Sequence, residues 1–331
     1  MSTRREFLRT LGSVGTVGWL TGLSTELLGA SMTSMSKAFQ PVKFGIIADI
    51  HRDLTPDADE RLEAFMKKVD EEKPDFLMSL GDFAHPIAEN ERFVRRFASS
   101  KSPVYHVLGN HEMDRADKKT AVAFLHMPSA FYSFDIGGYH CVVLDPNYIY
   151  TDGKFLDYEK ANYYGFTGKI NYINDEQCEW LEADLRKTHL PTFLFSHQSL
   201  DNSIANREQV RQILERENER CGFQKILGCF NGHHHTDFHR IKNNIHYFGI
   251  NSVSYLYHRE DLPGRYSEEM SKKLCCPGNI SMYRNPLFCF VTIDTSGRLS
   301  LRGVKSEWMV TPPAGVSDAS PNISDRDVVL S

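Results

Sequence analysis

The sequence contains little that would place it in a specialised structural class. Its seven cysteines are odd in number and show no C-x-x-C spacing, so they define no disulfide framework. No internal period of the kind that builds solenoids or propellers is present. With 41% hydrophobic and 24% charged residues, the composition is typical of globular proteins. A chain of 331 residues can bury a sizeable core as one large domain or two small ones.

An excess of positive charge is absent as well. The chain carries 38 basic and 43 acidic residues, which gives a formal net charge of -5. Residues 1–37 hold four basic residues against two acidic ones, so the rest of the chain has a net charge of -7. Proteins that bind duplex nucleic acid usually present a strongly basic surface. We therefore expect no duplex nucleic acid as the main ligand.

The first 37 residues differ from the rest. Paired arginines within residues 3–9 precede a weakly apolar run, residues 11–27, which is too short and too polar to span a membrane comfortably. Small residues follow at 29–31, as expected of a leader that is removed from the mature protein. The arginine stretch resembles the twin-arginine signal of bacteria. It predicts export by the twin-arginine machinery and a periplasmic or secreted mature protein without a membrane span; a basic N-terminus without targeting function is the alternative.

Beyond residue 37 the hydrophobic pattern alternates between strands and helices. Continuous apolar runs, as in residues 42–48, are typical of strands covered on both faces. Apolar positions at helical spacing, as in residues 57–73, predict amphipathic helices. Repeated units of this kind predict a largely parallel sheet, and the glycine pair at 137–138 predicts a hairpin. Residues 311–331 are rich in Pro, Ser and Asp and predict a loosely ordered tail.

Five predicted strands end in side chains that can bind metals. In open α/β sheets, ligands bind outside the carboxyl ends of strands, so these five loops are expected to meet in one crevice. Each loop alone is weak evidence, because Gly-Asp is commonly a turn and a single histidine is commonly structural. The five are Asp49-Ile50-His51, Gly81-Asp82, Gly109-Asn110-His111-Glu112, Ser196-His197 and Gly232-His233-His234-His235.

The order of these motifs along the chain resembles that of the calcineurin-like metallophosphoesterases, from about residue 42 to residue 304. The resemblance implies an α/β fold in residues 38–310: a four-layer αββα sandwich of two mixed β-sheets flanked by helices, with a dimetal site at strand carboxyl ends. It also implies that Asp82 bridges two divalent ions. One ion would be held by Asp49, His51, Asp82 and His235, and the other by Asp82, Asn110, His197 and His233.

The residue types of these motifs suit hydrolysis of a small phosphorylated substrate. Carboxylate oxygens and imidazole nitrogens bind Mn, Fe and Zn. Two such ions can lower the pKa of a shared water from about 15.7 to about 7, which gives a bridging hydroxide for in-line attack on phosphorus. The resemblance implies that His111 protonates or stabilises the leaving oxygen. The alternative is that His111 only orients Asp49 or Asp82.

Two other classes compete with this interpretation. The stretch His233-x-His235-x-Asp237 begins the H-x-H-x-D-H signature of the metallo-β-lactamase fold, but Phe238 stands where the last histidine should be. A non-catalytic module that binds metal or phosphate would keep the same scaffold. Such modules usually lose ligands, and none is lost here.

Two subgroups of the phosphoesterases can be compared with the chain. Purple acid phosphatases carry a tyrosine three residues after the Gly-Asp aspartate, and His85 stands at that position, which favours Mn, Zn or Fe(II) over the Fe(III) of that subgroup. Residues 206–232, together with residues 131–134, resemble the manganese-dependent ADP-ribose/CDP-alcohol diphosphatases. This likeness rests on common spacing.

Tyrosines are concentrated in an insert without clear periodicity, residues 145–173. Long loops beside a catalytic crevice often form lids or specificity walls, and aromatic faces can stack on a nucleobase. We therefore predict substrate contacts, with nucleotides among the candidate substrates, from Tyr148, Tyr150, Tyr163 and Tyr164. The alternative is a surface loop that packs on itself.

The three consecutive histidines require a separate prediction. Side chains alternate between the two faces of an extended segment. If residues 233–235 are extended, His233 and His235 face the crevice together. His234 then faces away and has a packing role.

Overall fold

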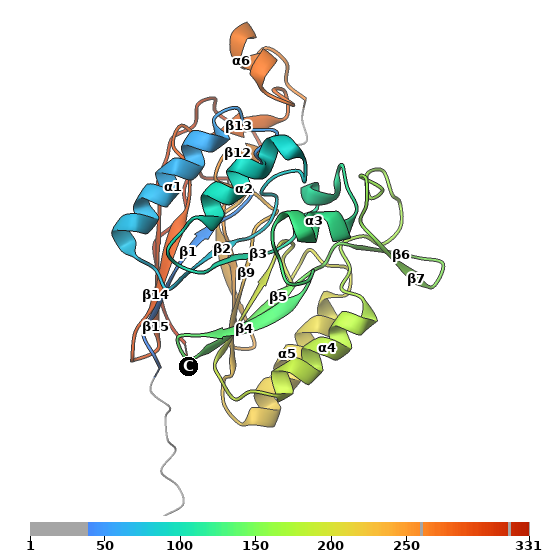
Figure 1. Ribbon diagram of the computed structural model, residues 1–331, viewed down its shortest axis with the longest axis vertical. Coiled ribbons are helices and arrows are strands. Elements are labelled where there is room, and N and C mark those ends of the chain that lie inside the picture. The colour runs from blue at the N-terminus through green and yellow to red at the C-terminus, as the bar shows by residue number, and fades with distance from the viewer. Residues whose placement is uncertain (1–38, 259–260, 317–318, 331) are drawn as a thin grey trace, which may run out of the picture. The chain divides into compact units, whose positions relative to one another are not determined.

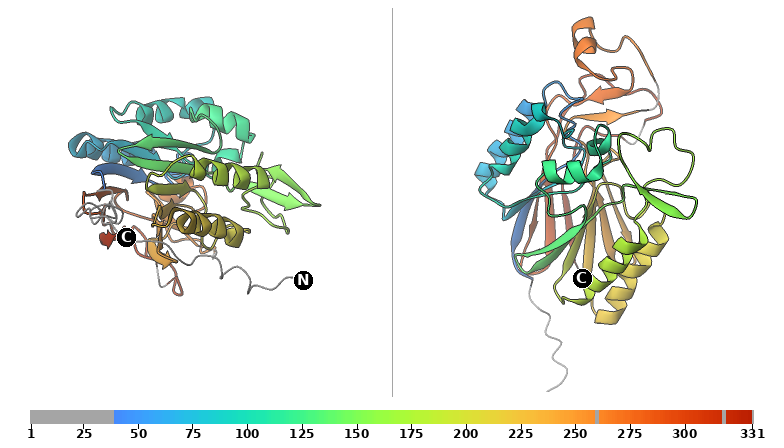
Figure 2. Two further views of the ribbon diagram at one scale, coloured as in Figure 1. Left: turned by 90° about the horizontal axis from the view of Figure 1, so that it is seen from below. Right: turned by 45° about the vertical axis from the view of Figure 1, so that its right-hand side comes forward.

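The computed structural model describes residues 39–258, 261–316 and 319–330. The predicted export leader, residues 1–37, lies outside this part of the chain. Two six-stranded sheets lie at the centre of the described part, and helices cover their outer faces (Figures 1 and 2). This is the four-layer αββα sandwich that the resemblance implied. Among the described residues, no helix has the length and apolarity needed to cross a bilayer.

The first sheet has the order β16-β15-β14-β1-β2-β3. β1, β2 and β3 run parallel, whereas β14, β15 and β16 pair antiparallel, so the sheet is mixed. The strands are β1 (Val42–Ile47), β2 (Phe76–Ser79), β3 (Val104–His106), β14 (Cys289–Ile293), β15 (Arg298–Gly303) and β16 (Arg326–Val329).

The second sheet has the order β10-β11-β9-β8-β5-β4. Its inner strands β5, β8, β9 and β11 run parallel, and β4 and β10 pair antiparallel at the edges. The strands are β4 (Tyr132–Ile136), β5 (Tyr139–Leu144), β8 (Thr192–Ser196), β9 (Ile226–Asn231), β10 (Phe238–Lys242) and β11 (Ile245–Gly249). Gly137 and Gly138, both with positive φ, form the predicted turn between β4 and β5.

Helices α1 and α2 cover the first sheet, and α4 and α5 cover the second (Figure 1). Two small antiparallel pairs, β6–β7 and β12–β13, stand apart from the main sheets. These elements are α1 (Ala58–Glu72), η1 (Ala88–Asn90), α2 (Glu91–Ala98), η2 (His111–Met113), α3 (Lys118–Phe124), β6 (Tyr148–Thr151), β7 (Lys154–Asp157), α4 (Asp175–Arg186), α5 (Arg207–Cys221), β12 (Tyr255–Tyr257), α6 (Glu268–Lys273) and β13 (Ile280–Met282).

The apolar runs of the sequence follow from this layering. Along β5, Cys141 and Val143 belong to the core between the sheets, and Val142 and Leu144 belong to the core under α4 and α5. Successive side chains of a strand point to opposite faces, so a strand with helices on one side and a sheet on the other must be apolar at every position. This explains why period-2 alternation is weak in the central strands.

The C-terminal segment differs in part from the prediction. Residues 311–331 were expected to form a loosely ordered tail. Instead, Arg326–Val329 form β16, which pairs antiparallel with β15. Arg302 donates hydrogen bonds to both carboxylate oxygens of Asp327 across the pair, at 2.8 and 3.0 Å. The expectation therefore does not hold for these four residues, because backbone pairing with an edge strand needs no continuous apolar run.

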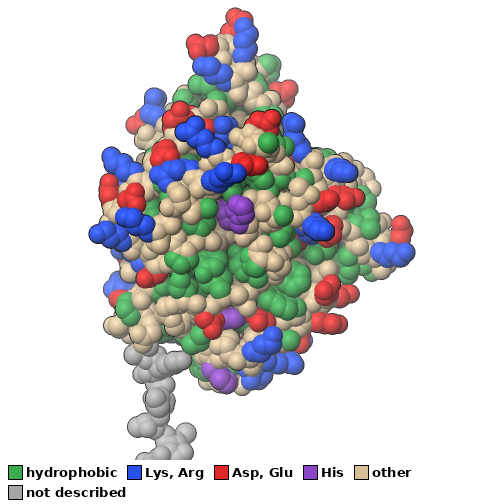
Figure 3. All heavy atoms as spheres, in the orientation of Figure 1, with side chains coloured by type: hydrophobic (Ala, Val, Ile, Leu, Met, Phe, Trp, Pro, Cys, Tyr) green, Lys and Arg blue, Asp and Glu red, His purple; other side chains and the backbone are tan. Residues whose placement is uncertain are grey.

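The surface of the face drawn in Figure 3 carries interspersed acidic and basic side chains, and hydrophobic side chains gather in its lower half. No continuous basic patch is present on the described part of this face.

Candidate metal centre

The central parallel strands bring the five predicted loops together. β1, β2, β3, β8 and β9 end at the same edge of the sandwich, and the loops that follow them carry the potential ligands. Asp49, His51 and His235 each offer one donor atom within 4.8 Å of the other two. Asp82, His197 and His233 form a second group of the same kind.

Asp82 lies between the two groups. Its Oδ2 atom lies 3.1 Å from Nε2 of His197 and 3.7 Å from Nε2 of His51, and these histidines come from the two different predicted ligand sets. Its other carboxylate oxygen accepts a hydrogen bond of 2.9 Å from the backbone N–H of His111. The aspartate is buried, and one of its oxygens lies close to histidines of both predicted ligand sets.

Two histidines present a defined nitrogen to the centre. Nδ1 of His197 donates to the carbonyl of Leu80 at 2.7 Å, and Nδ1 of His235 donates to the carbonyl of Tyr255 at 2.7 Å. A carbonyl accepts only, so Nδ1 carries a proton and Nε2 is the nitrogen that is left for the centre. Nε2 of His235 lies 3.1 Å from Nε2 of His51. The backbone therefore prepares both rings as metal ligands.

The charge of the centre also fits divalent ions. Burial opposes charge on His197, but the carboxylates of Asp82 and Asp49 outweigh it and raise the pKa of His197 to about 10. Two buried carboxylates thus favour a nearby positive charge, which a divalent cation would supply in place of the Nε2 proton of His197. Burial together with neighbouring histidines holds the pKa of His51 and of His233 well below its ordinary value, so these rings are neutral, as ligation requires.

Asn110 supplies a further donor that fits a cation. Its Nδ2 donates to the hydroxyl of Tyr163 at 3.1 Å. Its Oδ1 is buried and has no hydrogen-bond partner among the described residues. A buried amide oxygen without a partner costs stability, and a divalent cation would satisfy it.

Five of the seven predicted ligands adopt a left-handed backbone conformation. Non-glycine residues rarely do so, and they cluster at functional sites when they do. Asp and His are among the side chains that tolerate this region best. The five and their φ angles are Asp49 (52°), His51 (50°), Asp82 (51°), His233 (67°) and His235 (51°).

These angles correct the reasoning about the histidine run. Residues 233–235 are not extended, so alternation along a strand cannot set their directions. The left-handed turns at His233 and His235 direct these side chains instead: His233 Nδ1 lies 3.2 Å from His197 Nε2, and His235 lies beside His51. His234 contacts the hydroxyl of Ser203 through Nε2.

Two glycines are required by the close approach of the carboxylates. A Cβ atom on Gly109 would lie 2.1 Å from Oδ1 of Asp82, and one on Gly232 would lie 2.5 Å from Oδ2 of Asp49. Contacts this short are impossible. The glycines of the Gly-Asn-His-Glu and Gly-His-x-His motifs therefore leave room for the side chains of other loops.

Glu112 holds the loop of Asp82 in place, a role that the sequence analysis missed. Its buried carboxylate accepts hydrogen bonds from the backbone N–H groups of Asp82, Phe83 and Gly109, at 3.1, 2.5 and 2.7 Å. Burial and the charge of Asp82 raise the pKa of Glu112 to about 7. The sequence shows Glu112 as the last residue of the Gly-Asn-His-Glu motif, which could have indicated this role.

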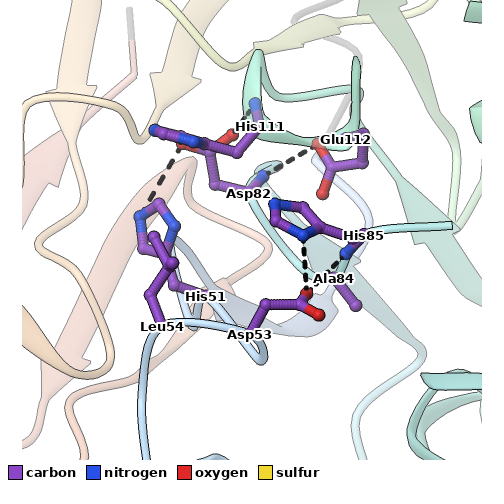
Figure 4. A pocket seen from close by; sticks show the side chains of 8 residues that line it. All are labelled: His51, Asp53, Leu54, Asp82, Ala84, His85, His111 and Glu112. Atoms are coloured by element: carbon purple, nitrogen blue, oxygen red, sulfur yellow. Dashed lines mark hydrogen bonds and ion pairs between the residues drawn. The ribbon is translucent and has the colours of Figure 1, made fainter. Parts of the chain in front are cut away.

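His111 lies at a small hollow beside Asp82 (Figure 4). Its Nδ1 donates to Oδ2 of Asp114 at 2.7 Å, and its Nε2 lies 3.9 Å from Oδ2 of Asp82. Burial opposes charge on the ring, but Asp82 and Asp114 outweigh it and raise the pKa of His111 to about 9. His111 is therefore protonated near neutral pH and directs Nε2 toward the centre.

The same hollow contains two residues that received no role from the sequence. His85 replaces the tyrosine of purple acid phosphatases and lies on the wall of the hollow in Figure 4. Its ring nitrogens lie 3.6 Å from Asp53 and 3.6 Å from Asp114. Asp53 also accepts a hydrogen bond of 2.7 Å from the backbone N–H of His85. His85 thus contacts two carboxylates around the hollow.

The four predicted substrate contacts fall into two groups. Tyr163 and Tyr164 lie against the His111 loop, and Tyr164 is 58% exposed. Tyr148 is buried and packs against the ammonium group of Lys118. Tyr150 stacks on Tyr172 with ring centroids 5.5 Å apart. Tyr150 is thus engaged within the insert itself, as in the self-packed alternative, and Tyr148 is engaged by a side chain of α3.

Comparison with known proteins agrees with this geometry. A model of the calcineurin-like phosphoesterase family matches residues 42–237, more than half of the chain. The chain belongs to this family. It is therefore a phosphoesterase, and the metallo-β-lactamase interpretation is wrong.

Individual relatives are distant. A 3',5'-cyclic-nucleotide phosphodiesterase of Nostoc sp. is 24% identical over 253 residues, which cover 70% of this chain and 85% of that protein. The serine/threonine-protein phosphatase CPPED1 of Mus musculus is 24% identical over 176 residues, which cover 50% of this chain and 54% of that protein. The structure of a dimetal phosphatase from Danio rerio matches with a TM-score of 0.57 and 15% identity, covering 88% of this chain and 99% of that one. This last likeness shows the fold.

Proposed function

We propose that the chain hydrolyses phosphoester bonds of small phosphorylated substrates at a centre of two divalent ions. The observation that carries the proposal is the place of Asp82 Oδ2 between His197 of one predicted ligand set and His51 of the other. In this proposal, the residues that hold the two ions are Asp49, His51, Asp82, Asn110, His197, His233 and His235.

The residues around the centre have different roles in the proposed reaction. Two bound ions would supply a hydroxide nucleophile near neutral pH and neutralise the phosphoryl oxygens. His111 directs the Nε2 end of its ring toward the centre, where it can donate a proton to the leaving oxygen. Asp114 holds the opposite nitrogen of the ring, Nδ1, and so fixes the orientation of the imidazole. Glu112 holds the backbone of Asp82, and Gly109 leaves room for the Asp82 carboxylate.

Nucleotides are the substrate class that we propose to test first. The Nostoc relative is named as a 3',5'-cyclic-nucleotide phosphodiesterase, which supports this choice. Tyr164 exposes an aromatic ring close to His111, and such a ring can stack on a base. The spacing shared with the manganese-dependent ADP-ribose/CDP-alcohol diphosphatases adds nucleoside diphosphate-alcohols as substrates, and manganese as the first ion to test.

The test combines metal analysis with a substrate panel. Metal-free protein is loaded with Mn, Fe(II) or Zn and assayed on a phosphomonoester, an aryl phosphodiester, a cyclic nucleotide and a nucleoside diphosphate-alcohol. We expect about two ions per chain and turnover of at least one class. Asp82→Asn should lose turnover, and Asp152→Asn, in the exposed β6–β7 turn, should keep it. Two bound ions without turnover of any substrate would instead support the non-catalytic module.

We also propose that residues 1–37 direct export through the twin-arginine route and that the mature protein is periplasmic or secreted. The support is the sequence pattern alone, since these residues lie outside the described part of the chain. A cofactor loaded before export would agree with this route, which carries folded proteins.

A further inference from the structure

The hydroxyl of Tyr163 connects two residues of the centre that the sequence analysis treated separately. Oη of Tyr163 lies 2.5 Å from Oδ1 of Asp114 and 3.1 Å from Nδ2 of Asn110. Asp114 in turn accepts the hydrogen bond from Nδ1 of His111. One hydroxyl therefore contacts both the carboxylate that orients His111 and the amide of a proposed metal ligand. Tyr163 is only 7% exposed, so little of it is available to a substrate.

The hydrogen-bonding capacity of a phenol fixes the direction of each contact. A phenol has one hydrogen to donate and can accept in return. Oδ1 of Asp114, at 2.5 Å, and the backbone carbonyl of Asn110, at 3.3 Å, both accept only, and the shorter contact places the Tyr163 hydrogen toward Asp114. Asn110 then meets a lone pair, which requires its Nδ2 end to face Tyr163. Its Oδ1 end is left facing the centre, which agrees with the buried oxygen that has no partner.

The ring of Tyr163 is held by its own loop. It stacks on the buried ring of Tyr158 with centroids 4.4 Å apart and an interplanar angle of 15°. The loop is joined to η2 by a hydrogen bond of 3.0 Å from the backbone N–H of Ala161 to the carbonyl of Met113. Tyr163 is thus a rigid support, which a positioning residue needs in order to keep its partners within a narrow range of geometry.

We propose that Tyr163 is a positioning residue that orients His111 through Asp114 and selects the oxygen end of the Asn110 amide for metal binding. This inference rests on the proposed function, because it assumes that His111 acts on the leaving oxygen. It replaces the earlier expectation that Tyr163 contacts the substrate. Tyr164, whose hydroxyl lies 3.3 Å from Nδ1 of His111 and whose ring is exposed, keeps that expectation.

The test removes one oxygen atom. Tyr163→Phe keeps the ring and its stacking but loses the contacts of the hydroxyl with Asp114 and with the side chain and backbone carbonyl of Asn110. Tyr158→Phe is the matched control: its hydroxyl is also held in the loop, donating to Oδ1 of Asn171 at 2.8 Å and accepting from the backbone N–H of Asn171 at 2.9 Å. Both variants should unfold at similar temperatures, which a thermal melt checks.

Two measurements separate positioning from a structural role. The first is Mn binding to the metal-free protein by titration calorimetry, in which Tyr163→Phe should weaken one of the two sites by about 10-fold or more. The second is kcat on an alkyl phosphate and on an aryl phosphate. Tyr163→Phe should slow the alkyl substrate by about 10-fold or more, and the aryl substrate less, because an alkyl leaving oxygen depends more on a proton from His111. KM should change little for either substrate.

The outcomes are distinguishable. If Tyr163→Phe matches Tyr158→Phe in Mn affinity and slows both substrates equally, the positioning role is wrong even when His111→Ala is slow. If His111→Ala itself retains full kcat on the alkyl substrate, the proposed role of His111 fails, and the kinetic part of this inference fails with it. Weakened Mn binding in Tyr163→Phe would then still support the orientation of Asn110.

Discussion

The hydrogen-bond partner of each histidine ring in this centre determines which role the ring can take. His197 and His235 each use one ring nitrogen to donate to a backbone carbonyl, which leaves the other nitrogen for a cation. His111 differs, since Asp114 holds its Nδ1 and its Nε2 stays 3.9 Å from Asp82. A carbonyl partner at Nδ1 fixes which ring nitrogen faces the centre, whereas a carboxylate partner at Nδ1 also stabilises the charged ring. The partner at Nδ1 therefore separates these two proposed ligands from the proposed acid.

This distinction predicts the behaviour of His111→Ala. The variant should keep about two ions per chain, because none of the proposed ligands is lost. Its kcat should fall by roughly 10²- to 10⁴-fold, the usual contribution of a general acid. Elemental analysis and steady-state kinetics measure the two quantities. Loss of one ion would show that His111 is a ligand or the support of one.

The histidine run supplies a second prediction. His233→Ala and His235→Ala should each deplete a different ion, since their rings lie in the two different groups of donors. His234→Ala should retain both ions and most of the activity. It should cost about 1 kcal/mol of stability through the lost contact with Ser203. Metal content is measured by elemental analysis. The assignment would be contradicted if the His234 variant lost metal while the His233 or His235 variant kept both ions.

At the scale of elements, the main strands and helices could be predicted from local pattern, because burial on both faces makes most positions of β1, β5, β8 and β9 apolar. The ligand motifs were visible for a related reason, since each directly follows such a strand. The β6–β7 pair was not visible, because Lys154–Asp157 is mostly exposed and its pairing depends on a partner strand.

Contacts between loops that are distant along the chain could also not be predicted from the sequence. Asp114 follows the Gly-Asn-His-Glu motif, but only the turn of η2 shows that its carboxylate faces Nδ1 of His111. Tyr163 reaches the same carboxylate from 49 positions further along the chain. The packing of the insert decides which tyrosines face the centre, and the amino-acid composition of the insert does not predict this packing. Tyr148 and Tyr150 were grouped with Tyr163 for that reason.

Helix α5 and the residue before strand β9 provide a test of stability. Lys225 is fully buried, and its ammonium group donates to Glu217 at 2.7 Å and to the carbonyl of Thr188 at 2.7 Å. Glu217→Gln removes the charge that balances this ammonium group, so the free energy of unfolding should fall by about 3 kcal/mol at pH 7. Glu208→Gln, at an exposed position of the same helix, is the control and should change little.

The effect of Glu217→Gln should depend on pH. Burial opposes the charged form of Glu217, but hydrogen bonds from Arg220 and Lys225 outweigh it and lower its pKa from 4.5 to about 2. A folded-state pKa below the unfolded value gives stability that is present above pH 4.5 and lost as the pH falls toward 2. Urea unfolding of metal-free protein should therefore show the variant approaching the unmodified protein between pH 4.5 and 2. A constant difference would contradict the role of this ion pair.

At the scale of the whole molecule, the two sheets contribute different halves of one centre. The first sheet supplies Asp49, His51, Asp82 and Asn110, and the second supplies His197, His233 and His235. Neither sheet alone holds a complete proposed ligand set. The centre therefore depends on the packing of the sheets, and a metal loaded in the cell would need the folded sandwich.

The proposed export through the twin-arginine route leads to a prediction that concerns residues 1–37. Replacing Arg4 and Arg5 by lysine should block the twin-arginine route. The precursor should then accumulate in the cytoplasm, and little mature protein should reach the periplasm, as measured by fractionation and immunoblotting. Arg9→Lys, which keeps the arginine pair, is the control. Unchanged export of the double variant would contradict the proposed leader.

The left-handed backbone at five of the seven proposed ligands limits how this centre could be rebuilt elsewhere. A designer who copied only the seven side-chain identities onto the ends of ordinary strands would aim most of them in the wrong direction. Each left-handed non-glycine residue also costs roughly 1–3 kcal/mol, which a host scaffold would have to offset through its own packing. Transplantation would have to carry the loops as rigid units, with Gly109, Gly232 and Glu112 included. The smallest unit of this centre that could be transplanted is therefore a set of loops with their backbone conformations, and not the seven side chains alone.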